Sequence, residues 1–212
     1  MRKRILFFLL AFLLAACTAA GNDLAATRPV AQAGDLTQIP QASLDAATAA
    51  SQTGEPVTEQ AMKISSPAFD DGQSIPKKFT CQGENVSPAL TWSGVPAGTK
   101  SLALVTEDPD APSGIFIHWV LYNMPPGLSG LPEKVAASPQ VAGTGTQGSS
   151  GFGRPGYGGP CPPPGKAHRY YFKLYALDLD PQLPTGLNAA GLQKQMAGHI
   201  LAQAQWMGTF QR

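Results

Sequence analysis

The part of the chain from residue 62 to residue 212 alternates short apolar runs with turn residues. Each run is rich in β-branched and aromatic side chains and is bounded by Pro or Gly, a pattern typical of β-strands joined by turns. We predict strands at residues 62–65, 89–92, 101–107, 115–123, 169–177 and 206–210. The runs 101–105 and 118–122 are almost continuously apolar, as central strands buried on both faces are. The pattern predicts one mainly β domain, a β-sandwich.

A helical period occurs only near the end of this domain. Apolar and large side chains follow one another there at spacings of three and four residues, namely Leu192, Met196, His199, Ile200 and Gln203. This spacing places them on one face of a helix, so we expect a helix over residues 187–203. The run 206–210 would then be a short closing strand.

Composition separates this domain from what precedes it. Pro and Gly make up 43 of the 212 residues, and 37 of these lie in residues 62–212, so they indicate stiff loops between strands and not disorder. The formal net charge is +1, and no basic run occurs beyond residues 2–4. Nucleic-acid binding needs a clustered positive surface, and the sequence therefore gives no support to it.

The first 16 residues have the pattern of an export signal. Three basic residues at positions 2–4 precede the apolar run 5–16, which is too short for a stable membrane-spanning helix. The run ends in Leu14-Ala15-Ala16-Cys17, which resembles the lipobox of bacterial lipoproteins. The resemblance implies cleavage before Cys17 and acylation of that residue. The alternative is an ordinary secretory signal followed by an incidental cysteine.

Residues 17–61 are expected to tether the domain to a membrane. No aromatic residue occurs between positions 18 and 60, so this segment cannot bury enough apolar surface to offset its ordering entropy. As a flexible chain it would span roughly 35–40 Å. By analogy with lipoprotein sorting, Thr18 after the cysteine favours the periplasmic face of the outer membrane, if the host envelope is Gram-negative.

Candidate chemistry begins directly after the strand predicted at 101–107. The segment Asp108-Pro109-Asp110-Ala111-Pro112 places two carboxylates in a turn that two prolines stiffen. The alternative is a turn in which the Asp side chains only cap the preceding strand.

Two histidines form the second part of the candidate site. Strict alternation along residues 116–123 would place His118 on the same face as Phe116, Val120 and Tyr122, where it could equally be a core histidine. Further along, the proline-rich loop 158–165 leads into a strand on which His168, Tyr170 and Phe172 share a face. Imidazoles, a phenol and backbone N–H groups together could bind a small anion such as phosphate.

These motifs together resemble the phosphatidylethanolamine-binding protein family, and more narrowly its bacterial Raf kinase inhibitor-like branch. The resemblance covers residues 62–212, and its motifs occur in family order: 85–92 (NVSPALTW), 108–113 (DPDAPS), 118–124 (HWVLYNM), 159–163 (GPCPP), 168–170 (HRY) and 208–210 (GTF). The segment 142–158 departs from the branch's usual pattern. Kinase inhibition is not implied, because the C-terminal helix of the eukaryotic members is missing.

The resemblance implies an antiparallel β-sandwich with a small pocket for phosphate-like groups, including phospholipid head groups. Carried over residue by residue, the pocket consists of Asp108, Asp110, His118, one of Pro162, Pro163 and Pro164 (we take Pro163), His168 and Tyr170. The imidazoles and Tyr170 would donate hydrogen bonds to the anion, and the carboxylates would orient a histidine or accept from an ammonium group. No cofactor is implied, and inhibition of a protein partner remains open.

Cys81 and Cys161 are the two cysteines within the domain. In an exported protein such a pair is more often a disulfide than a metal site, although two free thiols are the alternative. A bridge would brace the proline-rich loop beside the proposed pocket.

Three classes of function compete. The first is the non-catalytic binding protein described above. The second is a hydrolase that uses a His/Asp acid–base pair in the same pocket, although none of the common hydrolase motifs occurs. The third is a structural envelope protein that binds protein partners through exposed loops such as 151–157. Two His and two Asp could also ligate a metal, but their spacing is not diagnostic.

Overall fold

The computed structural model describes residues 61–212. The predicted export signal, Cys17 and almost all of the tether lie outside the described residues. Within them the chain forms nine strands and one α-helix: β1 (Lys63–Ser65), β2 (Leu90–Ser93), β3 (Ser101–Asp108), β4 (Phe116–Met124), β5 (Gly130–Leu131), β6 (Gln140–Val141), β7 (Gly145–Gln147), β8 (His168–Leu177), α1 (Ala189–Met196) and β9 (Ile200–Phe210). A short 3₁₀ helix spans Lys77–Phe79.

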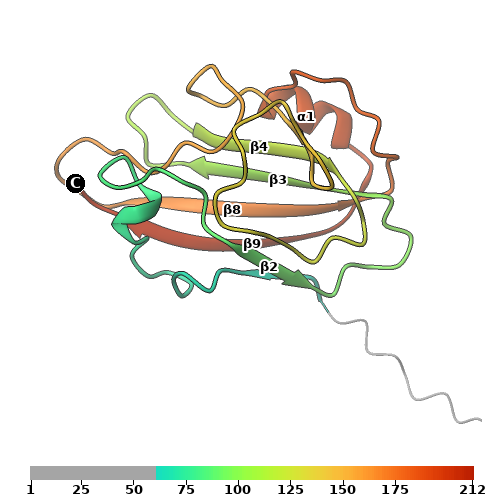
Figure 1. Ribbon diagram of the computed structural model, residues 1–212, viewed down its shortest axis with the longest axis horizontal. Coiled ribbons are helices and arrows are strands. Elements are labelled where there is room, and N and C mark those ends of the chain that lie inside the picture. The colour runs from blue at the N-terminus through green and yellow to red at the C-terminus, as the bar shows by residue number, and fades with distance from the viewer. Residues whose placement is uncertain (1–60) are drawn as a thin grey trace, which may run out of the picture. The chain divides into compact units, whose positions relative to one another are not determined.

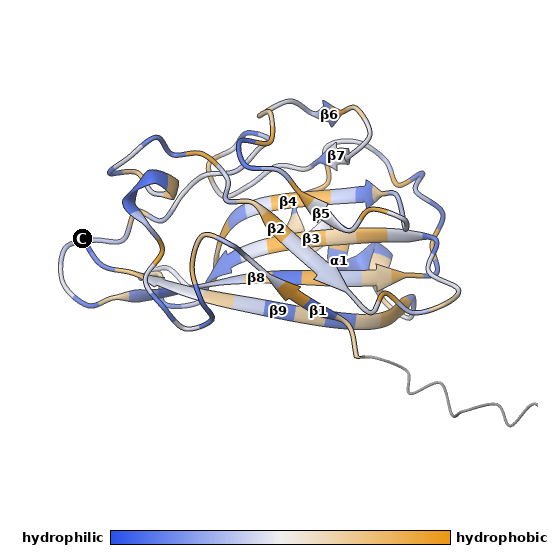
Figure 2. Cartoon of the chain, turned by 60° about the horizontal axis from the view of Figure 1, so that its bottom comes forward, coloured by the Kyte–Doolittle hydropathy of each residue, from blue (hydrophilic) through white to orange (hydrophobic). Residues whose placement is uncertain are grey.

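The strands form two antiparallel sheets. The larger sheet has the order β6-β7-β4-β3-β8-β9, and the smaller has the order β1-β2-β5. The smaller sheet covers one face of the larger one, and α1 lies against the opposite face (Figures 1 and 2). The prediction of a mainly β sandwich is confirmed. Strands β5, β6 and β7 were not predicted, because two or three residues are too few to show a period.

Burial on both faces explains the continuous apolar run of β3. Leu102 and Leu104 point into the core between the sheets, where they join Trp92 of β2. Their neighbours Ala103 and Val105 point the other way, into a second cluster that includes Leu192 of α1. The central position predicted for this strand is confirmed, because β3 lies between β4 and β8.

The helix predicted over residues 187–203 is shorter than expected. It begins after Asn188, whose side chain accepts a hydrogen bond from the Gly191 N–H at 2.8 Å, and it ends at Met196. Gly198 then takes a φ of 81°, a left-handed conformation that glycine adopts at little cost and that turns the chain into β9. His199, Ile200 and Gln203 therefore do not belong to the helix, and the closing strand starts at Ile200 and not at residue 206.

Within residues 61–212, no helix has both the length and the apolar character that crossing a bilayer requires.

Candidate functional site

A cavity of about 190 Å³ opens where three adjacent strands of the larger sheet begin or end. Asp108 is the last residue of β3, Phe116 is the first of β4, and His168 is the first of β8. The segment 161–163 forms another wall. The cavity is lined by Asp108, Ala111, Pro112, Ser113, Phe116, His118, Phe152, Cys161, Pro162, Pro163 and His168. Apart from Asp108, Ser113 and the two imidazoles, these side chains are apolar.

A β-bulge positions His118. Thr106 of β3 is opposite Trp119 of β4, whereas the next residue, Glu107, is opposite Ile117, so His118 has no partner of its own in the register. An extra residue of this kind bends a strand and redirects its side chains, and bulges are frequent next to functional sites.

The bulge makes the predicted alternation wrong at this position. Val120 and Tyr122 pack in the cluster on the α1 side of the sheet. The His118 ring instead contacts Tyr170, which belongs to the core on the other side, with 5.1 Å between ring centroids. His118 therefore shares a face with Phe116 but not with Val120 and Tyr122.

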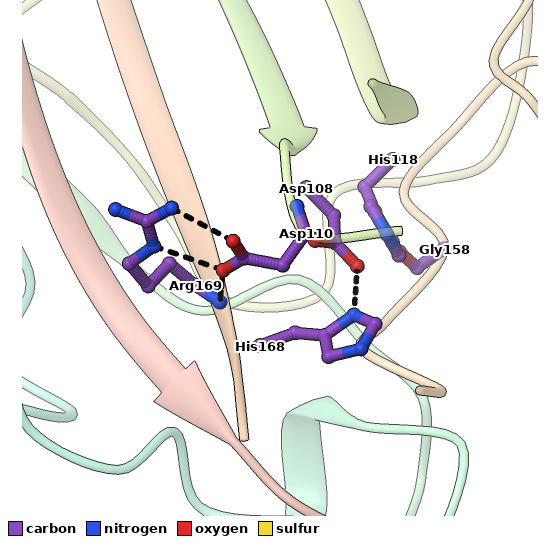
Figure 3. Close-up of polar contacts among 6 residues, drawn as sticks. All are labelled: Asp108, Asp110, His118, Gly158, His168 and Arg169. Carbon is purple, nitrogen blue, oxygen red and sulfur yellow. Dashed lines mark hydrogen bonds and ion pairs between the residues drawn. The ribbon is translucent and has the colours of Figure 1, made fainter. Parts of the chain in front are cut away.

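Asp108 and His168 form a buried pair at the wall of the cavity (Figure 3). One carboxylate oxygen of Asp108 lies 2.8 Å from His168 Nδ1. Its other oxygen accepts a hydrogen bond from the Asp110 N–H at 2.8 Å, which fixes the turn that follows β3. Since an ionised carboxylate only accepts, the hydrogen of the pair lies on Nδ1 of His168.

His118 is held by the backbone of Gly158. Its Nδ1 lies 2.7 Å from the Gly158 carbonyl oxygen, which can only accept, so Nδ1 carries the hydrogen. The Gly158 N–H donates in turn to the His118 carbonyl at 3.0 Å. A Cβ at Gly158 would meet the ring of Phe152, so any side chain there would displace this partly exposed ring. Burial among the surrounding rings lowers the pKa of His118.

Both histidines keep Nε2 available. Among residues 61–212, neither Nε2 atom has a hydrogen-bond partner. Both atoms remain accessible to solvent. Because both side chains line the cavity, each presents an unused ring nitrogen to a ligand.

The proline-rich loop is anchored by a disulfide and by backbone contacts. Cys81 and Cys161 are bonded to each other, as the sequence favoured, with 5.4 Å between their Cα atoms. The Gly159 N–H donates to the Asn85 side-chain oxygen at 2.7 Å. A Cβ at Gly159 would lie 2.3 Å from the Phe79 carbonyl oxygen. The wall that carries Cys161 and the prolines is thus fixed from several directions.

Asp110 lies outside the cavity, unlike its predicted place in the pocket. Its carboxylate accepts from the Arg169 guanidinium at 2.7 Å and 2.9 Å and from the Arg169 N–H at 3.0 Å (Figure 3). These hydrogen bonds from Arg169 lower the pKa of Asp110 well below its usual range. Asp110 therefore ties the turn after β3 to the start of β8 and is not free for a ligand.

Tyr170 lies behind the cavity and does not belong to its lining. Its side chain is 1% exposed, and its hydroxyl finds no hydrogen-bond partner within residues 61–212. Burial, followed by the negative charge of nearby Asp108, raises the pKa of this phenol. It shares a face of β8 with His168 and Phe172, as the period-two pattern predicted.

Several lining residues escaped the sequence argument. Ser113 stands at the end of a motif that was recognised, and Cys161 was noted only as a brace. Phe116 and Phe152, whose rings meet edge to face at 5.0 Å, carry no pattern that marks them as walls of a site. No group of three or more metal-ligating side chains occurs in the described part of the chain.

A hollow of similar volume on the outer face of the larger sheet is a weaker candidate. It is lined by Lys173, Tyr175 and residues 203–205. Lys173, the charged residue of this lining, is already paired with Glu107.

The family model described as phosphatidylethanolamine-binding protein matches residues 65–211. A UPF0098 protein of the archaeon Methanothermobacter thermautotrophicus is 45% identical over 151 residues, which cover 71% of this chain and 99% of that protein. A Mycobacterium tuberculosis protein named "Putative lipoprotein LppC" is 40% identical over 199 residues, covering 93% of this chain and 90% of that protein.

Two solved structures are also similar. One is a phosphatidylethanolamine-binding protein homologue from Chlamydia trachomatis, with 43% identity and a TM-score of 0.65 over 72% of this chain and 98% of that one. The other is Escherichia coli YbcL, described as a member of the mammalian family, with 33% identity and a TM-score of 0.65 over 71% of this chain and 98% of that one. Both solved chains therefore consist almost entirely of the domain that residues 61–212 form here.

Proposed function

This chain belongs to the phosphatidylethanolamine-binding protein family, and on that premise we propose that it is a non-catalytic binding protein whose cavity takes a phosphate-like anion or a phospholipid head group. The observation that carries the proposal is the pair of unused Nε2 atoms, from His118 and His168, in a mainly apolar cavity. Few, well-placed polar groups in an apolar hollow are what ligand sites have in common.

The size of the cavity supports a small ligand. Sites for drug-sized molecules measure roughly 300–1,000 Å³. At about 190 Å³, this cavity suits a phosphate group with a short substituent, such as phosphoethanolamine. Asp108, the one carboxylate in the lining, would favour an ammonium group near its edge.

A titration tests the proposal. The lipid-free chain, residues 18–212, is labelled with ¹⁵N-histidine and titrated with phosphate and with phosphoethanolamine while the imidazole signals are followed by NMR. Saturable shifts of His118 and His168 are expected, with His199 as the internal control because it pairs with Asp178 outside the cavity. No shift of either cavity histidine at millimolar ligand would remove the anion site.

We propose further that the domain is held to the bacterial envelope through acylated Cys17, on the periplasmic face of the outer membrane in a Gram-negative host, with residues 17–61 as its tether. The relative named as a lipoprotein supports this, because its match covers 93% of this chain and so extends into the N-terminal segment. Metabolic labelling with palmitate should mark the wild type and not Cys17→Ser. Equal labelling of the wild type and the variant would contradict the proposed lipid anchor at Cys17.

A hydrolase is the second candidate, and the Asp108–His168 pair favours it. A carboxylate that orients an imidazole whose other nitrogen faces a cavity is the arrangement of a general base. Turnover of phosphoesters or esters by the wild type that is lost in His168→Ala would establish this activity. Inhibition of a protein partner would instead use exposed side chains beside the cavity, such as Phe152.

A further inference from the structure

The cavity contains no fixed positive charge. Among residues 61–212, neither Lys nor Arg lines it, and Asp108 is the one carboxylic acid of the lining. Arg169 is occupied by Asp110. Arg154 lies over the ring of the wall residue Phe152, and the Arg212 guanidinium contacts the sulfur of Cys161, but neither arginine belongs to the lining. An anion that enters therefore meets a carboxylate and two imidazoles, and its charge must be balanced by a proton.

The contacts of His118 favour its neutral form. Its Nδ1–H is used on the Gly158 carbonyl, and aromatic rings of Phe116, Phe152 and Tyr170 surround it. The charged or titratable groups that face it are Asp108 and His168 from the neighbouring strands, together with the Tyr170 phenol. Desolvation outweighs the attraction of Asp108 and lowers the pKa of His118. In the neutral ring Nε2 is an acceptor, so this nitrogen needs a hydrogen from its ligand.

His168 is paired with Asp108 through Nδ1. Its Nδ1–H is 2.8 Å from Asp108, so a second proton on Nε2 produces an imidazolium–carboxylate pair with no net charge. The groups that face His168 are Asp108, His118 across the cavity, the uncharged wall of Pro162 and Pro163, and, at longer range, Asp110. Cys161 does not titrate because it is in the disulfide. Protonated Nε2 is then a charge-assisted donor to an anionic oxygen.

Resting on the proposed function, we propose that the cavity binds a phosphate group in its singly charged form, which still carries an acidic hydrogen. His118 Nε2 accepts that hydrogen bond, and protonated His168 Nε2 donates to a charged oxygen. The two histidines thus have opposite roles, whereas the family resemblance of the sequence implied that both donate hydrogen bonds to the anion. The ligand class is the monoanion of a phosphomonoester or of inorganic phosphate, and phosphodiesters, which lack the hydrogen, bind less well.

Proton uptake is the first test of this assignment. The second pKa of a phosphomonoester is about 6, so above neutral pH the ligand is mostly dianionic and must gain a proton to bind in this way. Calorimetry of the lipid-free chain with phosphoethanolamine, in buffers of different ionisation enthalpy, should show uptake of at least about one proton at pH 7.5. By linkage, the Kd should rise at least about tenfold per pH unit above pH 7.

Dimethyl phosphate is the matched probe, because it is a monoanion without an acidic hydrogen. We expect it to bind about tenfold more weakly than phosphoethanolamine at pH 6, since one hydrogen bond is lost and the His118 acceptor is left unpaired. Equal binding of the two probes, or binding of phosphoethanolamine without proton uptake, would overturn the assignment and leave the proposed function intact. If neither probe binds between pH 5 and 8, the proposed function itself fails.

Histidine ¹⁵N shifts of the wild-type complex give a second test that needs no variant. The signals of His118 should retain the pattern of a neutral ring with its hydrogen on Nδ1, and those of His168 should show an imidazolium. An imidazolium at His118 in the complex would contradict the proposal. His118→Phe, which keeps an aromatic ring in the cluster, should lose the preference for the monoester, whereas Asp178→Asn, at an exposed pair outside the cavity, should keep it.

Discussion

Removing the Cys81–Cys161 disulfide should destabilise the domain strongly. The two residues are 80 positions apart in the sequence, so the bridge closes a long loop in the unfolded chain. For a loop of this length, the lost chain entropy corresponds to about 4.5 kcal/mol at 25 °C. Both residues are exposed, so a Cys81→Ser/Cys161→Ser double variant leaves no buried polar group behind, and its loss should reflect mainly the missing constraint.

Urea unfolding of the lipid-free chain, residues 18–212, measures this loss. With a slope of about 2 kcal/mol per molar urea, the midpoint of the double variant should lie roughly 2 M below that of the oxidised wild type. Reduced wild type should unfold at nearly the same urea concentration as the variant, which controls for the serine side chains. A midpoint shift below about 0.5 M would refute the reasoning, because the bridge would then contribute less than about 1 kcal/mol to the free energy of unfolding.

Three further predictions concern the frame of the cavity. Gly159→Ala should cost several kcal/mol, about 2–4, in urea unfolding, because its Cβ would lie 2.3 Å from the Phe79 carbonyl oxygen; a loss under about 1 kcal/mol would contradict that contact. Because the pKa of His118 is lowered in the folded protein, the unfolded chain binds a proton at this residue more readily. The free energy of unfolding should therefore fall as the pH decreases from about 7 toward the folded-state pKa of His118. In Tm measurements at different pH, His118→Phe should lack this decrease. The lowered pKa of Asp110 contributes stability above pH 4, and this stability is lost as the carboxylate is protonated at lower pH. Arg169→Gln should therefore flatten the dependence of Tm on pH between about pH 4 and 3. An unchanged dependence would exclude the Arg169 contact as the cause of the lowered pKa.

The parts of the fold that follow from a simple period were predictable. The run Leu102–Val105 is apolar on both faces, and it lies in β3, the strand between β4 and β8 that is buried on both faces. The entry of β8 likewise places His168 and Tyr170 on one side of the sheet, as its period requires. The disulfide could be expected because residues 1–16 predict export, and a pair of thiols in one domain of an exported protein is usually oxidised.

Local breaks in these periods were not predictable. The bulge beside His118 changes which residues share its face, and no sequence signal distinguishes it from a regular strand. The helix ends at Met196 because Gly198 turns the chain, although large side chains continue at helical spacing beyond it.

Competition between partners also escaped the sequence. Asp110 stands two residues from Asp108 in one motif, yet Arg169 occupies its carboxylate, while Asp108 alone reaches the cavity. Which of two neighbouring acids meets a ligand depends on a partner 59 positions away, and only the packed sheet brings that partner into contact.

The central claim is that the cavity between β3, β4 and β8 binds a phosphate group through the two histidines. A crystal structure of the lipid-free chain with phosphoethanolamine tests it most directly. We predict the phosphate inside the cavity, with oxygens about 2.6–3.0 Å from Nε2 of both His118 and His168. An empty cavity at saturating ligand, or a phosphate bound elsewhere on the domain, would contradict the account.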